Sequence, residues 1–290
     1  MIFLFLLNIL TWLTVPHFEE GGVLVKQYEV KGFQNAVSLS PDNLGKIYIL
    51  DNKANQVIKL NENLVEVKRN GKQGWGDGLF DTPTSIDAST GLDIFICDGK
   101  NNRVQRFDRN LNYISSLVTN LTTFLPQYQF NTPVSSILMN SNDLYVYDKD
   151  NKRVVIYKDG LTPVNSFGEY QSSEGRIVRG RKMVKDKNNY IFIHDIGQNA
   201  VLKYDNFGTF VKKIQVDTIY SISVYDNNLY LLTNNKIYSY NIEKSTFEDM
   251  YDLFEYNTIS DFTDFVVLSK EKYLILEKNK LSYWKLINKN

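Results

Sequence analysis

One strand-like segment recurs six times along the 290-residue chain, and this repeat constrains the fold more than any other feature. The six copies are IYILD, IFICD, LYVYD, IFIHD, LYLLT and YLILE, at 47–51, 94–98, 144–148, 191–195, 229–233 and 273–277. Their last residues lie 47, 50, 47, 38 and 44 positions apart, and a short apolar strand precedes and follows each copy. A period of about 40 to 50 residues with several short strands per unit is typical of a β-propeller, in which each unit forms one blade.

The repeats predict an all-β fold, a six-bladed β-propeller of four-stranded antiparallel blades. The sixth repeat supplies only three strands before the chain ends, at 265–269, 273–277 and 281–286. We expect an N-terminal strand at 23–30 (VLVKQYEV) to complete the last blade and so close the ring, which removes an exposed sheet edge. No residues remain for a second domain, so residues 21–290 are predicted to form one propeller domain.

Four of the repeated strands end in aspartate, at Asp51, Asp98, Asp148 and Asp195. The residues four positions after these aspartates are Asn55, Asn102, Lys152 and Asn199. An aspartate there can accept hydrogen bonds from the backbone of the following turn, and asparagine tolerates left-handed geometry inside the turn. Because the same turn chemistry recurs in every full-length repeat, we interpret the motif as a turn device rather than a ligand site.

The N-terminal segment Ile2–Val15 carries no charge. It is shorter than the roughly 20 residues that a membrane-spanning helix needs, and it is typical of a signal-peptide core. No Lys or Arg precedes it and no A-x-A-like cleavage site follows, so an uncleaved anchor and a misassigned start remain alternatives. We expect residues 1–20 to be a signal peptide or short apolar leader, and the protein to be exported to the periplasm, the cell envelope or the medium.

Charge and composition exclude several classes of protein. The 33 basic and 33 acidic residues balance, so the chain as a whole has no attraction to nucleic acid. One cysteine excludes a disulfide scaffold, a cysteine zinc site and CxxC chemistry. The two histidines, His17 and His194, lie far apart in the chain, which disfavours a histidine metal centre. We predict no cofactor, no membrane span after the leader, and a monomer.

The segment 74–114 resembles one family of repeats. It carries a glycine-rich approach, Phe80, Pro83, the Asp98 strand end, an Asn-Asn-Arg turn and a closing Phe-Asp pair. In these features the chain resembles the NHL-repeat β-propellers, and segments 134–160 and 183–210 match more loosely. The resemblance implies a six-bladed ring that serves mainly as a binding platform. It implies no particular substrate, because function lies in sites placed on a fold.

Three long connections, at 70–83, 118–133 and 166–181, should lie on one face of the predicted ring. They carry aromatic and arginine side chains, which often supply binding energy at interfaces. The candidate ligand-binding residues are Trp75, Phe80, Tyr128, Phe130, Arg176, Arg179, Arg181 and Lys182. Phe124 and Tyr170 lie in the same connections. The alternative for the aromatic residues is inward packing between neighbouring blades.

The run 176–182 is the densest basic cluster of the chain. Guanidinium groups pair with phosphate or carboxylate in two-pronged fashion, so a phosphate, an acidic glycan or nucleic acid are candidate ligands. A solvated loop with salt bridges between blades is the alternative. The zero net charge and the predicted export disfavour a nucleic-acid partner.

An enzyme is the main alternative, because propellers similar to these include metal-dependent lactonases and lyases with an ion in the central channel. Such a site needs several oxygen or nitrogen ligands from the inner strands. The strand starts supply Asn35, Ser85, Ser135, Lys182, Ser221 and Asp264. One carboxylate and one ammonium make a poor metal site, and the repeat position of Cys97 and His194 predicts packed side chains. We therefore expect a non-catalytic binding or scaffold propeller that recognises a protein, peptide or envelope ligand.

Overall fold

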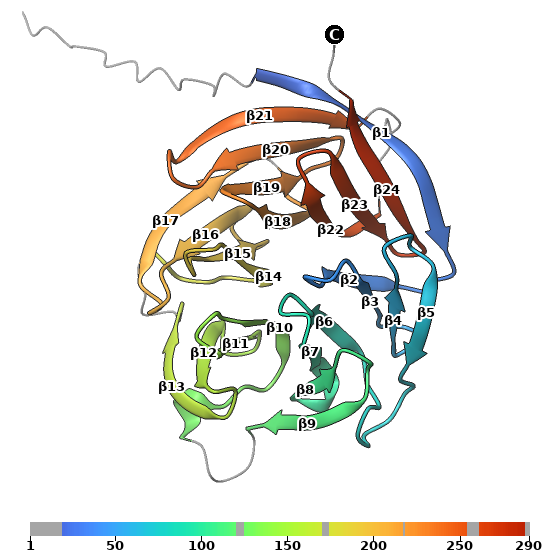
Figure 1. Ribbon diagram of the computed structural model, residues 1–290. Coiled ribbons are helices and arrows are strands. Elements are labelled where there is room, and N and C mark those ends of the chain that lie inside the picture. The colour runs from blue at the N-terminus through green and yellow to red at the C-terminus, as the bar shows by residue number, and fades with distance from the viewer. Residues whose placement is uncertain (1–18, 120–124, 170–173, 217, 254–260, 288–290) are drawn as a thin grey trace, which may run out of the picture.

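The computed structural model describes residues 19–119, 125–169, 174–216, 218–253 and 261–287. These residues form an all-β, propeller-like fold of four-stranded antiparallel blades around a centre (Figure 1). Four of the sheets are separate. In chain order their strands are β2 (Ala36–Pro41), β3 (Ile47–Asp51), β4 (Gln56–Leu60) and β5 (Glu66–Asn70); β6 (Pro83–Asp87), β7 (Asp93–Asp98), β8 (Arg103–Asp108) and β9 (Tyr113–Val118); β10 (Pro133–Leu138), β11 (Leu144–Asp148), β12 (Arg153–Lys158) and β13 (Thr162–Phe167); and β14 (Gly180–Lys185), β15 (Ile191–Asp195), β16 (Ala200–Tyr204) and β17 (Phe210–Gln215).

The remaining strands form a single eight-stranded sheet, in the order β18-β19-β20-β21-β1-β24-β23-β22. Their bounds are β18 (Ser221–Tyr225), β19 (Asn228–Leu232), β20 (Lys236–Asn241), β21 (Thr246–Leu253), β22 (Phe262–Ser269), β23 (Lys272–Glu277), β24 (Lys280–Ile287) and β1 (Glu19–Lys31). The structure thus has four separate sheets and one larger sheet, not the six separate blades that the repeat count predicts.

The N-terminal strand β1 is the cause of this difference. Its pairing with β24 is antiparallel, from Val23 opposite Ile287 to Lys31 opposite Lys280, which is the pairing that the sequence predicts. However, β1 has 13 residues and begins before the predicted start of the strand. Its first part pairs in parallel with the outer strand β21, so that Leu24 lies beside Leu253 as well as Leu286. One long strand therefore joins two sets of four strands.

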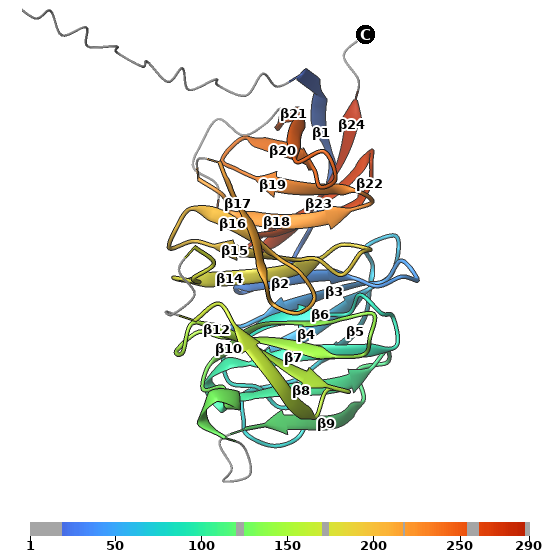
Figure 2. The same cartoon turned by 90° about the vertical axis from the view of Figure 1, so that its left-hand side faces the viewer.

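The inner strands of neighbouring sheets form a closed ring. Each of β2, β6, β10, β14, β18 and β22 contacts the next, and β22 returns to contact β2, as Figure 1 shows around the centre. The side view in Figure 2 shows the outer strand β17 running obliquely across the strands inside it, as the twist of a sheet requires. The inner strands therefore surround the central channel, while strands such as β17 form the rim.

A register shift occurs at the start of five inner strands, where the chain inserts one residue before regular pairing resumes. The inserted residues are Val37, Thr84, Val134, Arg181 and Thr263. A bulge of this kind breaks the strict alternation of side chains between the two faces of a strand. As a result, two consecutive residues of four of these strands line the same end of the channel, for example Arg181 and Lys182, whereas β10 contributes only Val134 there.

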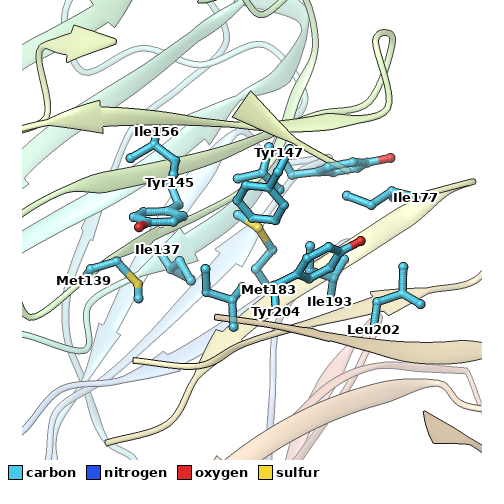
Figure 3. Close-up of a cluster of buried hydrophobic side chains, with 13 residues drawn as sticks. Ile137, Met139, Tyr145, Tyr147, Ile156, Ile177, Met183, Ile193, Leu202 and Tyr204 are labelled. Atoms are coloured by element: carbon cyan, nitrogen blue, oxygen red, sulfur yellow. The ribbon is translucent and has the colours of Figure 1, made fainter. Parts of the chain in front are cut away.

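The hydrophobic core lies between neighbouring sheets. Figure 3 shows one such cluster, in which Tyr147 of β11 packs with Met183, Ile193 and Tyr204 of the next sheet. Gly180 allows the close approach, because a Cβ atom there would lie 2.8 Å from Cζ of the Tyr147 ring. The Gly180 amide also donates a hydrogen bond to the Tyr147 hydroxyl, at 2.9 Å. The repeated apolar strands are therefore buried on both faces.

The repeated aspartates form the predicted turns. Asp51 accepts hydrogen bonds from the Ala54 amide in the following turn and from the Gln34 and Asn35 amides ahead of the inner strand. In the same way, the Asp195 carboxylate accepts hydrogen bonds from the backbone amides of Gly197, Val178 and Arg179. The fourth residues of the turns, Asn55, Asn102, Lys152 and Asn199, have φ angles of 54°, 52°, 53° and 48°. The motif is therefore a turn device, and it also fixes the chain that leads into the inner strand.

The predicted leader lies outside the described residues, apart from its last two residues, which begin β1. Within the described part of the chain, no helix has the length and apolar character to cross a membrane.

Candidate functional site

Buried arginines tie the first two long connections to the turns that follow Asp98 and Asp148, so these connections and turns lie at the same end of the ring. The Arg103 side chain donates from Nη2 to the carbonyls of Gly76 and Leu79, at 2.9 and 2.8 Å. Arg153 does the same for Pro126 and Gln129, at 2.7 and 2.9 Å. Each arginine lies 27 residues after its first acceptor and 24 residues after its second. The first two connections are therefore held in the same way.

Neither arginine is among the candidate ligand-binding residues, although Arg103 belongs to the Asn-Asn-Arg turn of the NHL-like segment. Both follow the left-handed residue of the turn, and they lie 50 positions apart, as do Asp98 and Asp148. Arg103 also donates from Nε to Asp98, at 2.9 Å, with 10% of its own side chain and none of the aspartate side chain exposed. Comparing charged residues between repeats would have identified the pair.

The four aromatic candidates separate into two groups. Trp75 is 74% exposed. Tyr128 lies in the short helix η2 (Pro126–Tyr128) and is partly buried. Its carbonyl accepts a hydrogen bond from the Tyr157 hydroxyl at 2.6 Å. Phe80 and Phe130 are fully buried. For these two the alternative of inward packing holds, and the expectation that they present a surface to a ligand is wrong.

The buried phenylalanines fill spaces beside the strands that follow them. The Phe80 ring packs against Phe107, with ring centroids 5.8 Å apart, and the Phe130 ring packs edge-on against Tyr157, at 6.0 Å. Phe124 and Tyr170, which the sequence placed in the same connections, lie outside the described residues.

The basic run 176–182 divides between two environments. Arg176 and Arg179 are exposed on the connection that leads into β14. Arg181 and Lys182 lie inside the channel, where the Arg181 Nη2 donates to the Thr263 carbonyl at 2.8 Å and the Lys182 ammonium lies 2.6 Å from the Asp264 carboxylate. The run is therefore not one basic surface patch.

Two cavities occupy the channel. One, of about 230 Å³, lies at the end that carries the long connections and is lined by Arg181, Thr263 and Asp264 among others. The other, of about 200 Å³, lies toward the opposite end and reaches Lys185 and Val224. Ser38, Ser85 and Lys182 line both cavities, so these residues mark the level at which the two cavities meet.

The Asp264 carboxylate is the centre of the polar contacts in the channel. Its Oδ2 accepts from the Leu39 amide at 2.8 Å. Its Oδ1 accepts from Lys182 Nζ and Ser221 Oγ, both at 2.6 Å, and from the Phe265 amide at 2.9 Å. Asp264 thus contacts the inner strands β2, β14 and β18 from its own strand β22. A carboxylate so fully engaged by donors has little capacity left to bind a metal ion.

Side-chain oxygens link most of the other inner strands to the backbone of the next. Each of the following side chains accepts a hydrogen bond from an amide on the neighbouring inner strand or at its end. The pairs are Ser38 with Ile86 (3.2 Å), Asp87 with Leu138 (2.8 Å), Ser135 with Met183 (3.0 Å) and Ser223 with Val267 (3.1 Å). Of the serines that the sequence placed at the channel, Ser135 joins neighbouring sheets in this way and Ser221 does so through Asp264. Ser85 Oγ has no hydrogen-bond partner among the described residues.

Cys97 and His194 are fully buried on the central strands β7 and β15. Burial raises the pKa of the Cys97 thiol to about 11, although the Ser136 and Ser85 hydroxyls partly oppose the shift. Burial, together with the charges of Arg181 and Lys182, lowers the pKa of His194 to about 3. At neutral pH both groups are therefore uncharged, and neither is placed to act as a nucleophile or base, as the sequence predicted for packed side chains.

Among the described residues, no group of three or more His, Cys, Asp or Glu side chains could hold a metal ion. Asn35, one of the residues that the sequence placed at the channel, instead donates from its side chain to the Asn52 side chain at 2.6 Å.

Comparison with known proteins gives a local sequence match and a match of fold. No protein-family model matches the chain. The human NHL repeat-containing protein 3 is 30% identical over 81 residues, which are 27% of this chain and 23% of that protein. The chain therefore spans less than a quarter of the length of this relative, and the NHL resemblance has direct support over part of the chain only.

Solved structures match most of the chain at low identity. A streptogramin B lyase matches with a TM-score of 0.64 and 12% identity, over 91% of this chain and 98% of that one. Virginiamycin B lyase from Staphylococcus aureus matches with a TM-score of 0.64 and 13% identity, over 91% of this chain and 100% of that one. A catalytically inactive histidine-to-alanine variant of that lyase with quinupristin matches with a TM-score of 0.60 and 14% identity, over 87% of this chain and 80% of that one. At such identities the likeness shows the β-propeller fold alone.

The Asp264 interactions predict a large loss of stability when the carboxylate is removed. Asp264→Asn leaves the partly buried Lys182 ammonium without its counter-ion, and we expect the free energy of unfolding to fall by about 3 to 5 kcal/mol in urea denaturation. The matched control is Asp261→Asn, which breaks the exposed pair with Lys278 and should change stability by less than about 1 kcal/mol. Equal effects of the two substitutions would contradict the role of Asp264.

His194 predicts a specific dependence of stability on pH. The imidazole stays neutral in the folded chain down to about pH 3, whereas in the unfolded chain it takes up a proton below about pH 6.5. Its contribution is therefore complete above that pH and is lost as the pH falls. Between about pH 7 and pH 5 the unfolding free energy of the wild type should fall by about 2 kcal/mol more than that of His194→Leu. Parallel urea-denaturation curves for the two proteins would refute this.

Proposed function

We propose that this protein is a non-catalytic binding or scaffold propeller that is exported to the cell envelope and recognises a protein, peptide or envelope ligand on the long-connection face. In this proposal the eight-stranded sheet counts as two blades that share β1, so that the ring has six blades in one domain at 21–290. Residues 1–20 would act as the export leader. Fractionation of cells that express the chain with and without these residues tests this role.

The exposure of Trp75 on a firmly held loop is the observation that carries the proposal. Its side chain is 74% exposed, although both neighbouring residues are fixed to the interior. The Gly74 carbonyl accepts from the Asn101 side chain at 2.9 Å, and the Gly76 carbonyl accepts from Arg103 at 2.9 Å. Because the backbone on both sides of Trp75 is already fixed, binding at this side chain has no loop-ordering cost, and exposed tryptophan is a residue type common in interface hot spots.

The exposed arginines of the third connection add to this face. The Arg176 carbonyl accepts from the Gln198 side chain at 2.7 Å, and the Arg179 amide donates to Asp195 at 2.9 Å. The backbone is thus fixed at both residues, while the two side chains are exposed. Arginine is enriched together with tryptophan at the centres of interfaces, so a partner with acidic and apolar groups would suit the face.

Two observations favour binding over a lyase-like or lactonase-like enzyme. In the virginiamycin B lyase variant, a histidine was replaced by alanine in a protein described as catalytically inactive. Of the two histidines here, His194 is fully buried with a pKa lowered to about 3, which does not suit proton transfer at neutral pH, and His17 lies outside the described residues. In addition, the Asp264 carboxylate already forms an ion pair with Lys182.

Alanine substitution of the face tests the proposal. The full chain and the double variant Trp75→Ala/Arg179→Ala are used to capture partners from an envelope fraction, and each captured partner is titrated against both proteins. We expect the double variant to bind at least about tenfold more weakly, since hot-spot residues contribute about 2 kcal/mol or more.

The matched control is Phe207→Ala/Arg109→Ala. Phe207 is 72% exposed and Arg109 is also exposed, and both lie in hairpin turns at the opposite end of the strands. This control should bind as the wild type does. Undiminished binding by the Trp75 and Arg179 variant, or equal loss in both variants, would show that the long-connection face is not the binding surface.

A further inference from the structure

The side chains that line the mouth of the central channel, at the end that carries the long connections, include two positive charges and one negative charge. The Lys182 ammonium and the Asp264 carboxylate form an ion pair at 2.6 Å and neutralise each other. Arg181, next to Lys182 in the chain, donates to the Thr263 carbonyl, and no carboxylate of the described residues lies within ion-pairing distance of its guanidinium group. The cavity of about 230 Å³ that these residues line therefore has a net positive charge.

The bulge at the start of β14 explains why this charge faces the cavity. At the equivalent positions of four other inner strands the inserted residues are Val37, Thr84, Val134 and Thr263, and all of them line the same cavity. Arg181 is the one charged residue in this set. In a regular strand only one of Arg181 and Lys182 would face the channel, and the bulge brings both there.

A hydroxyl group in this cavity is available as a hydrogen-bond donor. Ser38 lines the cavity, and its Oγ accepts from the Ile86 amide, which leaves its own O–H free to donate. Ser85 also lines the cavity, but its hydroxyl oxygen is buried beside the Cys97 thiol and does not face a ligand there. The Asp264 oxygens, by contrast, already accept from four donors. The free polar atoms of the cavity are therefore mainly donors, and a ligand that accepts hydrogen bonds would complement them.

We propose that the mouth of the channel binds a small oxyanion group, a carboxylate or a phosphate, through the Arg181 guanidinium and the Ser38 hydroxyl. Guanidinium pairs with such groups through two parallel N–H donors. The cavity is smaller than the roughly 300 to 1,000 Å³ of sites for drug-sized ligands, so the occupant is a small molecule or the end of a larger one. This site is independent of the proposed partner surface, because neither Trp75 nor Arg179 lines it.

Calorimetric titration of the full chain with inorganic phosphate, and separately with acetate, tests this site at constant chloride concentration. We expect one of the two anions to bind with a stoichiometry of one. Arg181→Gln should weaken that binding by roughly tenfold or more, because a hydrogen bond to a charged group contributes about 1.5 to 3 kcal/mol. Arg109→Gln removes the same charge from an exposed turn at the opposite end of the ring and should bind within about twofold of the wild type.

Two further variants keep the test decisive if Arg181→Gln does not fold. Arg181→Lys keeps the charge but loses the forked geometry, and Ser38→Ala removes the donor hydroxyl. Both should weaken binding of the anion measurably. Thermal unfolding of each variant without anion shows that it is folded. The proposal is overturned if the wild type binds neither anion, or if every folded variant at Arg181 and Ser38 binds as the wild type does. No partner protein enters these titrations, so they do not depend on the outcome of the partner experiment.

Discussion

The ring depends on the carboxylate of Asp264, which joins the last inner strand to the first. Its hydrogen bond to the Leu39 amide connects residues 225 positions apart, so almost the whole chain must be in place before it forms. Closing a loop of that length has an entropic cost that grows only slowly with length, and a few strong contacts can offset it. Asp264 provides such contacts inside the ring, and β1 provides a second closure outside by pairing with both β24 and β21.

The same interaction decides which chemistry the channel supports. Because Lys182, Ser221 and two amides engage the Asp264 oxygens, the channel holds a neutral ion pair where a metal site would need free carboxylates. The charge that remains is that of Arg181, and it attracts anions. The rigid ring also explains how the long connections can present exposed side chains, since buried arginines hold the first two connections against the turns.

Much of this architecture could be predicted from the sequence. The repeated strands, the aspartate turns and the pairing of the N-terminal strand with β24 all follow from residue patterns that recur about every 40 to 50 positions. The parallel pairing of β1 with β21 could not be predicted in this way. It depends on where the extra length of β1 lies relative to the edge of a distant strand, and no local pattern specifies that.

The candidate site was less predictable, and for physical reasons. The burial of Phe80 and Phe130 depends on gaps between sheets that form only in the folded ring. The basic run 176–182 looks continuous in the sequence, whereas the bulge before Lys182 turns Arg181 and Lys182 into the channel and leaves Arg176 and Arg179 outside. A bulge changes which face a side chain occupies without any change in composition, so alternation alone does not reveal it.

Native-state hydrogen exchange at the Leu39 amide tests the central claim most directly, because this amide donates to Asp264 across the closure of the ring. If the closure is part of the cooperative core, the Leu39 and Phe265 amides should exchange only through global unfolding, with the same free energy as the Ile49 amide on the buried strand β3. Exchange of Leu39 through local opening, at a free energy well below that of Ile49, would contradict the account.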